Sequence, residues 1–250
     1  MRALSSRGLL LLLLALALAC TWSARGLPLV RNSLVYARAS ENVIAAGYDP
    51  RPVVADSRQS YDKPILYAWA SAPLVRLLGN HDGLRASSFL TSAAFLLALL
   101  HFARSFRALL PERGERAFLW LAAFGPCVVY QFWSAHPDGW FAALAVLAWS
   151  QTHRLVTRPE APPVRGMLAL GATLLVAILL KNYGLVLLVS CPAYFLWHLR
   201  RLRAEPRAAR LLVSGLCVLA LLGLFVLTAW TGHNPLSRLE GEGGGVGQYA

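Results

Sequence analysis

The carboxylates and cations that could take part in chemistry gather at two places in a chain that is otherwise rich in apolar runs. The first is the stretch 32–69, which holds four of the twelve acidic residues. Its chemically capable side chains are Glu41, Asp49, Asp56, Asp62, Arg58 and Lys63. The second is the segment 135–140, where Asp138 follows His136 and Pro137. Carboxylates can act as general bases and Lys or Arg can bind phosphate, so both segments are candidate sites.

The composition indicates that membrane helices must position these groups. The 250 residues are 57% hydrophobic and 14% charged, with a mean hydropathy of +0.51, values typical of a polytopic membrane protein. The net charge of +12 comes from arginines in short clusters between apolar runs, a pattern typical of topology signals and lipid contact. No recognised motif accompanies the charge, which argues against nucleic acid as a partner.

The four cysteines lie in or beside apolar runs, without CxxC spacing or a histidine at metal-ligand spacing. We therefore interpret them as small buried hydrophobic residues and expect no disulfide and no zinc site. No cofactor is predicted, and the sequence leaves open whether a divalent metal assists.

Seven apolar runs of roughly membrane length predict seven transmembrane helices. They are residues 8–22, 87–103, 117–133, 139–153, 167–180, 183–199 and 211–230. The short segments on one side of this arrangement hold fourteen of the 24 basic residues, and this excess predicts that they are cytoplasmic. Those segments are 1–7, 104–116, 154–166 and 200–210. The basic start and apolar core of the first run also fit a signal peptide, but the later runs favour an uncleaved helix.

The predicted outer loop, 23–85, carries two short helical patterns. Residues 33–46 are amphipathic and end at Gly47, a candidate helix C-cap. Residues 64–79 are apolar but short and contain Pro73, which predicts an interfacial or re-entrant helix. If this second helix crossed the membrane, every later loop would lie on the opposite side. The arginine-rich segments would then be outside, against the charge pattern.

The predicted fold class is therefore an all-α, polytopic helical membrane protein with a long outer-face loop. We expect one transmembrane domain over 1–230, followed by a Gly-rich outer-face tail over 231–250. The tail is either a flexible end or the start of a further region of a longer protein. The expected location is a bacterial inner or plasma membrane, crossed several times, with the working face outward.

Several short motifs resemble the GT-C class of integral membrane glycosyltransferases. The most specific is D-K-P-I-L-Y-A-W at 62–69, which resembles the E-K-P-P-L-x-Y-W run of the protein O-mannosyltransferase and lipid A aminoarabinose transferase superfamily. The segment 85–88, R-A-S-S, resembles its R-L-P-S, and Lys181 with Asn182 resembles its K-G after a long helix. Residues 232–236, G-H-N-P-L, resemble a G-N-P-x stretch. The order of elements is similar over nearly the whole chain.

The resemblance implies a glycosyltransferase that moves a sugar from a polyprenyl-phosphate donor to an outer-face acceptor, which would be an envelope lipid, glycan or protein. Lys63, Arg58 and Lys181 are then the candidates for phosphate contact, with Asp62 as a neighbour of the first. The aromatics that could line the sugar and isoprenoid path are Tyr61, Tyr67, Trp69, Trp133 and Trp140. The alternative for these aromatics is an interfacial belt that only anchors the helices in the membrane.

One departure from the family concerns the catalytic base. Counting back from Gly47, the position of the family's first-loop catalytic Asp falls on Asn32. Asn can position a hydroxyl group by hydrogen bonds, but it cannot take up its proton. A neighbouring acid, namely Glu41, Asp49 or Asp56, could replace it; Asp138 could carry the role; or the protein is a weak or inactive catalyst.

Each residue around Asp138 has a structural alternative to a functional role. Asp138 itself could be the N-cap of the helix that follows Pro137. His136 could be an interfacial polar residue, and Lys181 could end an apolar run and extend its ammonium to water. In each of these alternatives the residue has a structural role and binds no substrate.

Two other function classes compete with the enzyme. A degenerate GT-C-like protein that binds a lipid-linked sugar without chemistry fits the asparagine at position 32. A transporter or flippase ranks third, because the predicted spans carry almost no internal charge and the sequence has no internal repeat.

Overall fold

The fold was analysed in a computed structural model of the chain. It describes residues 6–29, 31–49, 66–106, 114, 117–120, 136–157, 163–181, 184–202 and 215. The helices in these ranges are α1 Ser6–Ser23, η1 Ala24–Gly26, α2 Arg31–Ala45, α4 Leu66–Ser105, α7 Asp138–Thr157, α8 Pro163–Leu180 and α9 Gly184–Leu202. The described part contains no strand, so the all-α class is confirmed there.

Two helices of the described part are long and apolar enough to cross a membrane. They are Gly8–Gly26 and Leu66–Ser105, while Arg165–Leu180 and Gly184–Phe195 are shorter apolar helices. The predicted runs 117–133 and 211–230 lie almost entirely outside the described residues. A seven-span arrangement is therefore part of the proposal below.

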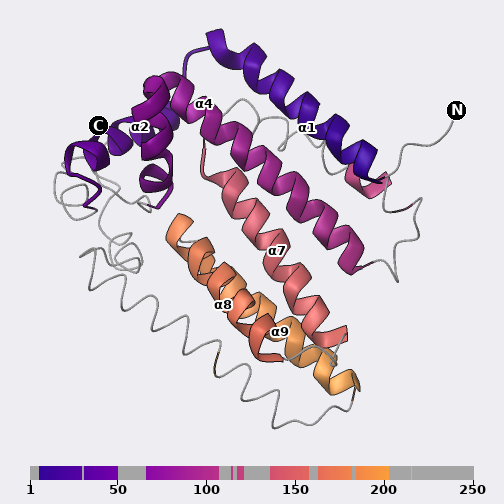
Figure 1. The fold of residues 1–250 in the computed structure, drawn as a ribbon. Coiled ribbons are helices and arrows are strands. Elements are labelled where there is room, and N and C mark those ends of the chain that lie inside the picture. Colours follow the sequence, from indigo (N-terminus) through magenta and orange to yellow (C-terminus); the bar gives the residue numbers. More distant parts are fainter. Residues whose placement is uncertain are drawn as a thin grey trace, which may run out of the picture.

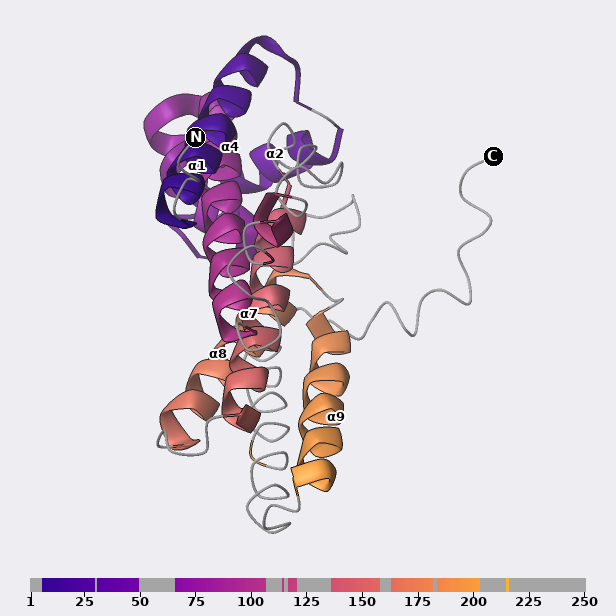
Figure 2. The same cartoon turned by 90° about the vertical axis from the view of Figure 1, so that its right-hand side faces the viewer.

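The helices pack side by side in nearly the order of the chain. α1 packs on α4, α4 packs on α7, and α7 contacts both α8 and α9 (Figures 1 and 2). The start of α1, the ends of α4, α7 and α9, and the start of α8 lie toward one end of the bundle (Figure 1). The exposed residues Arg104, Arg154 and Arg165 belong to this end. The opposite end gathers α2, the start of α7 and the end of α8.

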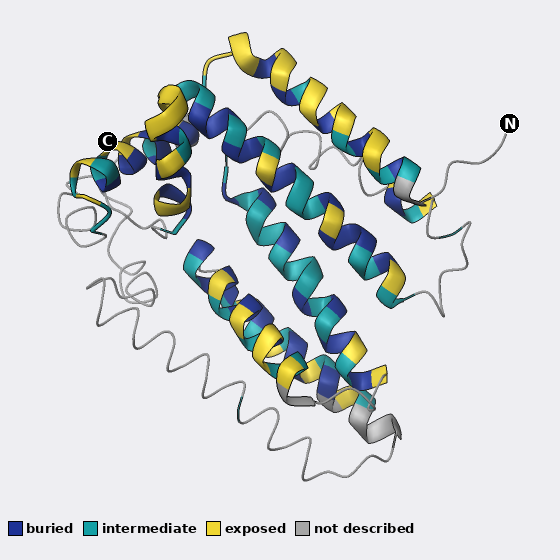
Figure 3. Ribbon diagram, in the orientation of Figure 1, coloured by how far each residue is buried: buried dark blue, intermediate teal, exposed yellow. Residues whose placement is uncertain are grey.

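Exposed residues recur along the helices of the bundle (Figure 3), and many of them are large and apolar. Leu11 of α1 is 67% exposed, Leu97 of α4 is 52% exposed and Val189 of α9 is 72% exposed. Water would oppose such a distribution, whereas a lipid surface would accommodate it.

The amphipathic pattern at 33–46 forms α2, which buries Tyr36, Ser40 and Val43 on one face. The helix ends at Ala45, and the predicted cap residue Gly47 follows it with a φ of 62°. The N–H of Tyr48 donates to the carbonyl of Val43 at 2.8 Å, and that of Gly47 donates to Ile44 at 3.1 Å. These two hydrogen bonds are those of a Schellman C-cap, so the prediction of a C-cap at Gly47 is confirmed.

Replacing Gly47 should test this cap without disturbing side-chain packing. No heavy atom lies within 4 Å of the position a Cβ would take, so Gly47→Ala adds only backbone strain at positive φ. We expect the free energy of unfolding to fall by about 1 kcal/mol, measured as a lower Tm of the purified protein in detergent. Gly26→Ala, which also meets open space, is the control. Equal Tm values for the two variants would contradict the cap.

The helix α4 consists of two arms that meet at Gly79, whose φ of 80° and ψ of 169° are not helical. The Ser71 and Ser87 hydroxyls lie 3.1 Å apart, and a Cβ on Gly83 would lie 2.5 Å from Cα of Val75. In each pair, the two residues lie equally far from Gly79 along the chain, one before it and one after it. The arms 66–78 and 80–105 therefore run antiparallel and are in direct contact. The predicted break at 79 is confirmed, but the second arm begins at 80, earlier than the predicted 87.

Candidate functional site

Asp138, His136 and Lys181 meet at the end of the bundle where α7 starts and α8 ends. The Lys181 ammonium forms an ion pair with Oδ1 of Asp138, and Nδ1 of His136 lies 3.2 Å from Oδ2. The side chain of Asp138 is 34% exposed and that of Lys181 is 28% exposed. A small solute or a lipid headgroup could therefore approach the carboxylate. The structure thus brings together three of the residues singled out in the sequence.

The local backbone explains why this pair forms. Pro137 precedes the first residue of α7, and its carbonyl accepts a hydrogen bond from the N–H of Phe141 at 3.0 Å. Lys181 follows the last residue of α8, and its N–H donates to the carbonyl of Ala177 at 3.0 Å. A carboxylate at a helix N-terminus and an ammonium at a helix C-terminus both complement the helix dipoles. The ion pair therefore also links the ends of α7 and α8.

The pKa of Asp138 is lowered to about 2 by its surroundings. The contact with His136 is the largest cause, and the ion pair with Lys181 adds to it, while partial burial acts in the opposite direction. The carboxylate is therefore ionised at neutral pH and is a weak proton acceptor as it stands. It could hold a substrate hydroxyl directly; turning Lys181 away would remove one cause of the lowered pKa, while the contact with His136 would remain.

The lowered pKa predicts a pH-dependent contribution to stability. Between about pH 4 and about pH 2 the unfolded chain takes up a proton that the folded chain does not, so stability falls with falling pH. Above this window the contribution is fully present. We expect the Tm difference between wild type and Asp138→Asn to shrink as the pH is lowered from 5 to 2 in about half-unit steps. A difference that stays constant with pH would show that the ion pair does not stabilise the fold.

An aromatic wall stands beside the cluster. The Tyr36 ring meets the imidazole of His136 edge to face, with ring centroids 5.9 Å apart, and meets the ring of Tyr67 at 4.9 Å. Trp140 is partly buried and packs against the hydrophobic core that contains Tyr36 and Tyr67. Tyr67 is fully buried, so in this arrangement it packs the core and does not line an open substrate path. Tyr36 was not among the predicted site residues; its only signal in the sequence was its place on the apolar face of the predicted amphipathic helix.

Three other predicted residues have contacts outside the Asp138 pair. Glu41 is exposed on α2 and accepts a hydrogen bond from the side-chain amide of Asn80. Asp49 lies in the turn after α2, where its N–H donates to the carbonyl of Ala46 at 3.2 Å. Trp69 is 40% exposed, and its indole N–H donates to the carbonyl of Tyr48 at 3.1 Å. The Trp69 contact joins the turn after α2 to the first arm of α4, and the Glu41 contact joins α2 to the start of the second arm.

The remaining predicted residues are outside what the structure describes. Asn32 lies in the first turn of α2, and only its backbone is described. The residues Asp56, Arg58, Tyr61, Asp62, Lys63 and Trp133 lie outside the described ranges. Among the described residues, no group of three or more His, Cys, Asp or Glu side chains could hold a metal ion.

Comparisons with protein-family models, with curated proteins and with solved structures found no match to this chain. The family resemblance therefore stays a prediction, and the function is argued from the residues and their geometry.

Proposed function

We propose that this chain is a GT-C-like membrane glycosyltransferase that moves a sugar from a polyprenyl-phosphate donor to an acceptor on the outer face of the membrane. The observation that carries the proposal is the meeting of Asp138, His136 and Lys181 at the bundle end opposite the exposed arginines. A carboxylate beside an ammonium suits a reaction that deprotonates a hydroxyl and releases a phosphate.

The proposed membrane arrangement has seven spans in a bacterial plasma membrane. The exposed Arg104, Arg154 and Arg165 would lie on the cytoplasmic side, and Asp138 and Lys181 on the outer side. Two helices of sufficient length and the apolar outward faces of the bundle support a membrane location. The donor could then reach the ion pair from the lipid phase without leaving the membrane.

The proposed reaction needs a rearrangement of the ion pair. When the donor arrives, the ammonium of Lys181 turns from Asp138 to the donor phosphate, which frees the carboxylate. The acceptor hydroxyl oxygen then attacks the anomeric carbon, its proton passes to Asp138, and the bond between that carbon and the phosphate oxygen breaks. The electron pair of that bond stays on the phosphate, where Lys181 stabilises it. His136 holds the carboxylate in place.

A second candidate function is binding of a lipid-linked sugar without chemistry. Two observations favour it: the asparagine at position 32, and the lowered pKa of Asp138, which weakens this carboxylate as a base. The Lys181 ammonium would then bind the phosphate, and no bond of the sugar would break.

The test is a transfer assay with the purified chain in proteoliposomes. Polyprenyl phosphates carrying radiolabelled hexoses or pentoses are supplied together with extracted envelope lipids, glycans and proteins. We expect at least one donor to release polyprenyl phosphate above the level of protein-free liposomes, and Asn32→Asp to turn it over faster. Bound donor without release by either protein would favour the second function. If the protein neither releases polyprenyl phosphate nor binds any donor, both proposed functions are wrong.

A further inference from the structure

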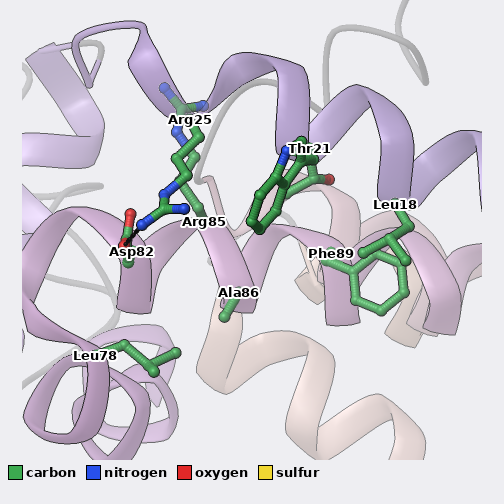
Figure 4. A pocket seen from close by; sticks show the side chains of 9 residues that line it. Leu18, Thr21, Arg25, Leu78, Asp82, Arg85, Ala86 and Phe89 are labelled. Carbon is green, nitrogen blue, oxygen red and sulfur yellow. Dashed lines mark hydrogen bonds and ion pairs between the residues drawn. The ribbon is translucent and has the colours of Figure 1, made fainter.

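A second polar cluster surrounds a cavity of about 320 Å³ between α1 and α4. Figure 4 shows Arg25, Arg85 and Asp82 at one end of the cavity and Leu18 and Phe89 at the other. Asp138, His136 and Lys181 do not line it, so it is distinct from the candidate active site. Its volume lies in the range of small-ligand sites in proteins.

The polar end of the cavity carries more positive than negative charge. A guanidinium nitrogen of Arg25 lies 3.2 Å from Oδ2 of Asp82, and Arg85 donates to the carbonyl of Leu27 at 3.0 Å. The lining therefore contains two guanidinium groups and one carboxylate, which leaves a single positive charge. The side chain of Arg25 is 54% exposed, so it can turn toward a ligand at the mouth. A phosphodiester, with one negative charge, would balance this end.

The apolar end lies on the two helices that are long enough to cross a membrane. Leu18 belongs to the span candidate Gly8–Gly26, and Phe89 belongs to Leu66–Ser105. Trp22 also lines the cavity, is 68% exposed, and has the Arg25 guanidinium 5.0 Å from its ring centroid. Exposed tryptophan and arginine at the end of a membrane helix mark the boundary between headgroups and hydrocarbon. The cavity is therefore charged at one end and apolar at the other, and this arrangement suits an amphiphile that lies across the boundary.

We propose that this cavity binds one anionic phospholipid of the surrounding bilayer. The phosphodiester contacts Arg25 and Arg85, and the first part of an acyl chain lies against Leu18 and Phe89. A bilayer phospholipid fits better than the glycosyl donor, because the donor phosphate must reach Lys181, which does not line the cavity. The bound lipid fills the space between α1 and α4 and so holds α1 to the bundle. The preference for a bilayer phospholipid over the glycosyl donor rests on the proposed function, whereas the binding of an anionic amphiphile in this cavity does not.

The test is lipid retention by the full chain, purified in detergent and examined by native mass spectrometry. Phosphatidylglycerol, phosphatidylcholine and polyprenyl phosphate are offered one at a time and then in competition. Wild type should retain one phosphatidylglycerol, and Arg25→Gln should reduce its affinity about fivefold, the effect of one arginine near a membrane surface. Ala86→Phe, which places a ring in the cavity without changing charge, should abolish retention. Arg104→Gln, at the other end of the bundle, is the control and should retain the lipid as wild type does.

Three results would overturn the proposal. The first is undiminished phosphatidylglycerol retention by both Arg25→Gln and Ala86→Phe. The second is equal retention of phosphatidylcholine, which has the same phosphodiester but a compensating choline cation; this would mean that the net negative charge of the lipid plays no part. The third is displacement of phosphatidylglycerol by an equal amount of polyprenyl phosphate, which would assign the cavity to the carrier lipid. If Ala86→Phe fails to give a helical circular dichroism spectrum, Arg25→Gln decides alone, because Arg25 is exposed and its replacement is compatible with folding.

Discussion

Gly83→Ala should lower the free energy of unfolding by about 3 kcal/mol, a large effect for one methyl group. Its Cβ would lie 2.5 Å from Cα and 2.6 Å from the backbone nitrogen of Val75 on the opposite arm of α4. Backbone atoms cannot move aside as a side chain can, so the two arms must separate. Separation would also break the contact between the hydroxyls of Ser71 and Ser87. The measurement is Tm by circular dichroism in detergent, with an expected decrease of roughly 6–12 °C.

The matched control is Gly166→Ala in α8. A Cβ there would meet Cδ2 of Leu155 at 2.6 Å, but that atom is the end of a flexible side chain. The gain in helix propensity, up to about 1 kcal/mol, should offset the small rearrangement. If Gly83→Ala were as stable as Gly166→Ala, the close antiparallel contact between the arms of α4 would be wrong.

Asp138→Asn should reduce sugar transfer by a factor of about 100 to 10,000, the usual contribution of a positioned general base. The substitution preserves the shape of the side chain but removes its charge and its ability to take up a proton. The decrease should appear in kcat, whereas donor binding should persist because Lys181 is still present. Lys181→Met should instead raise the KM for the donor by about tenfold or more, through the loss of a charge-assisted contact with phosphate.

Asp138→Asn and Lys181→Met are informative together because Asp138 and Lys181 form an ion pair in the absence of donor. Removal of Lys181 takes away one cause of the lowered pKa of Asp138, so that pKa should move up toward its ordinary value. The pH at which transfer is half-maximal should therefore rise in Lys181→Met. Arg104→Gln, which removes an exposed charge at the opposite end of the bundle, should change none of these values. Unchanged kcat in Asp138→Asn would remove this carboxylate from the chemistry.

Local features of the sequence determined most of the helical structure that can be described. The apolar periodicity at 33–46 predicted α2, and Gly47 predicted its end, because the left-handed conformation of a C-cap has a strong residue preference. The apolar segment 64–79 was expected to end at 79, where the structure has the non-helical Gly79. The composition of the segment 135–140 and the position of Lys181 after an apolar run identified the three residues of the candidate site, His136, Asp138 and Lys181. All of these depend on neighbouring residues alone.

Only the tertiary structure decided which of these residues meet. Asp138 and Lys181 are 43 positions apart, and no spacing rule predicts that the start of α7 and the end of α8 lie together. The burial of Tyr67 follows from the packing of α2 on α4, which its motif could not reveal. The cavity between α1 and α4 combines Arg25 with Asp82 and Arg85, all three of which fall in the predicted outer loop 23–85, although Arg25 and Asp82 are 57 positions apart. Backbone preferences are encoded locally, whereas contacts between helices depend on side-chain packing across the whole bundle.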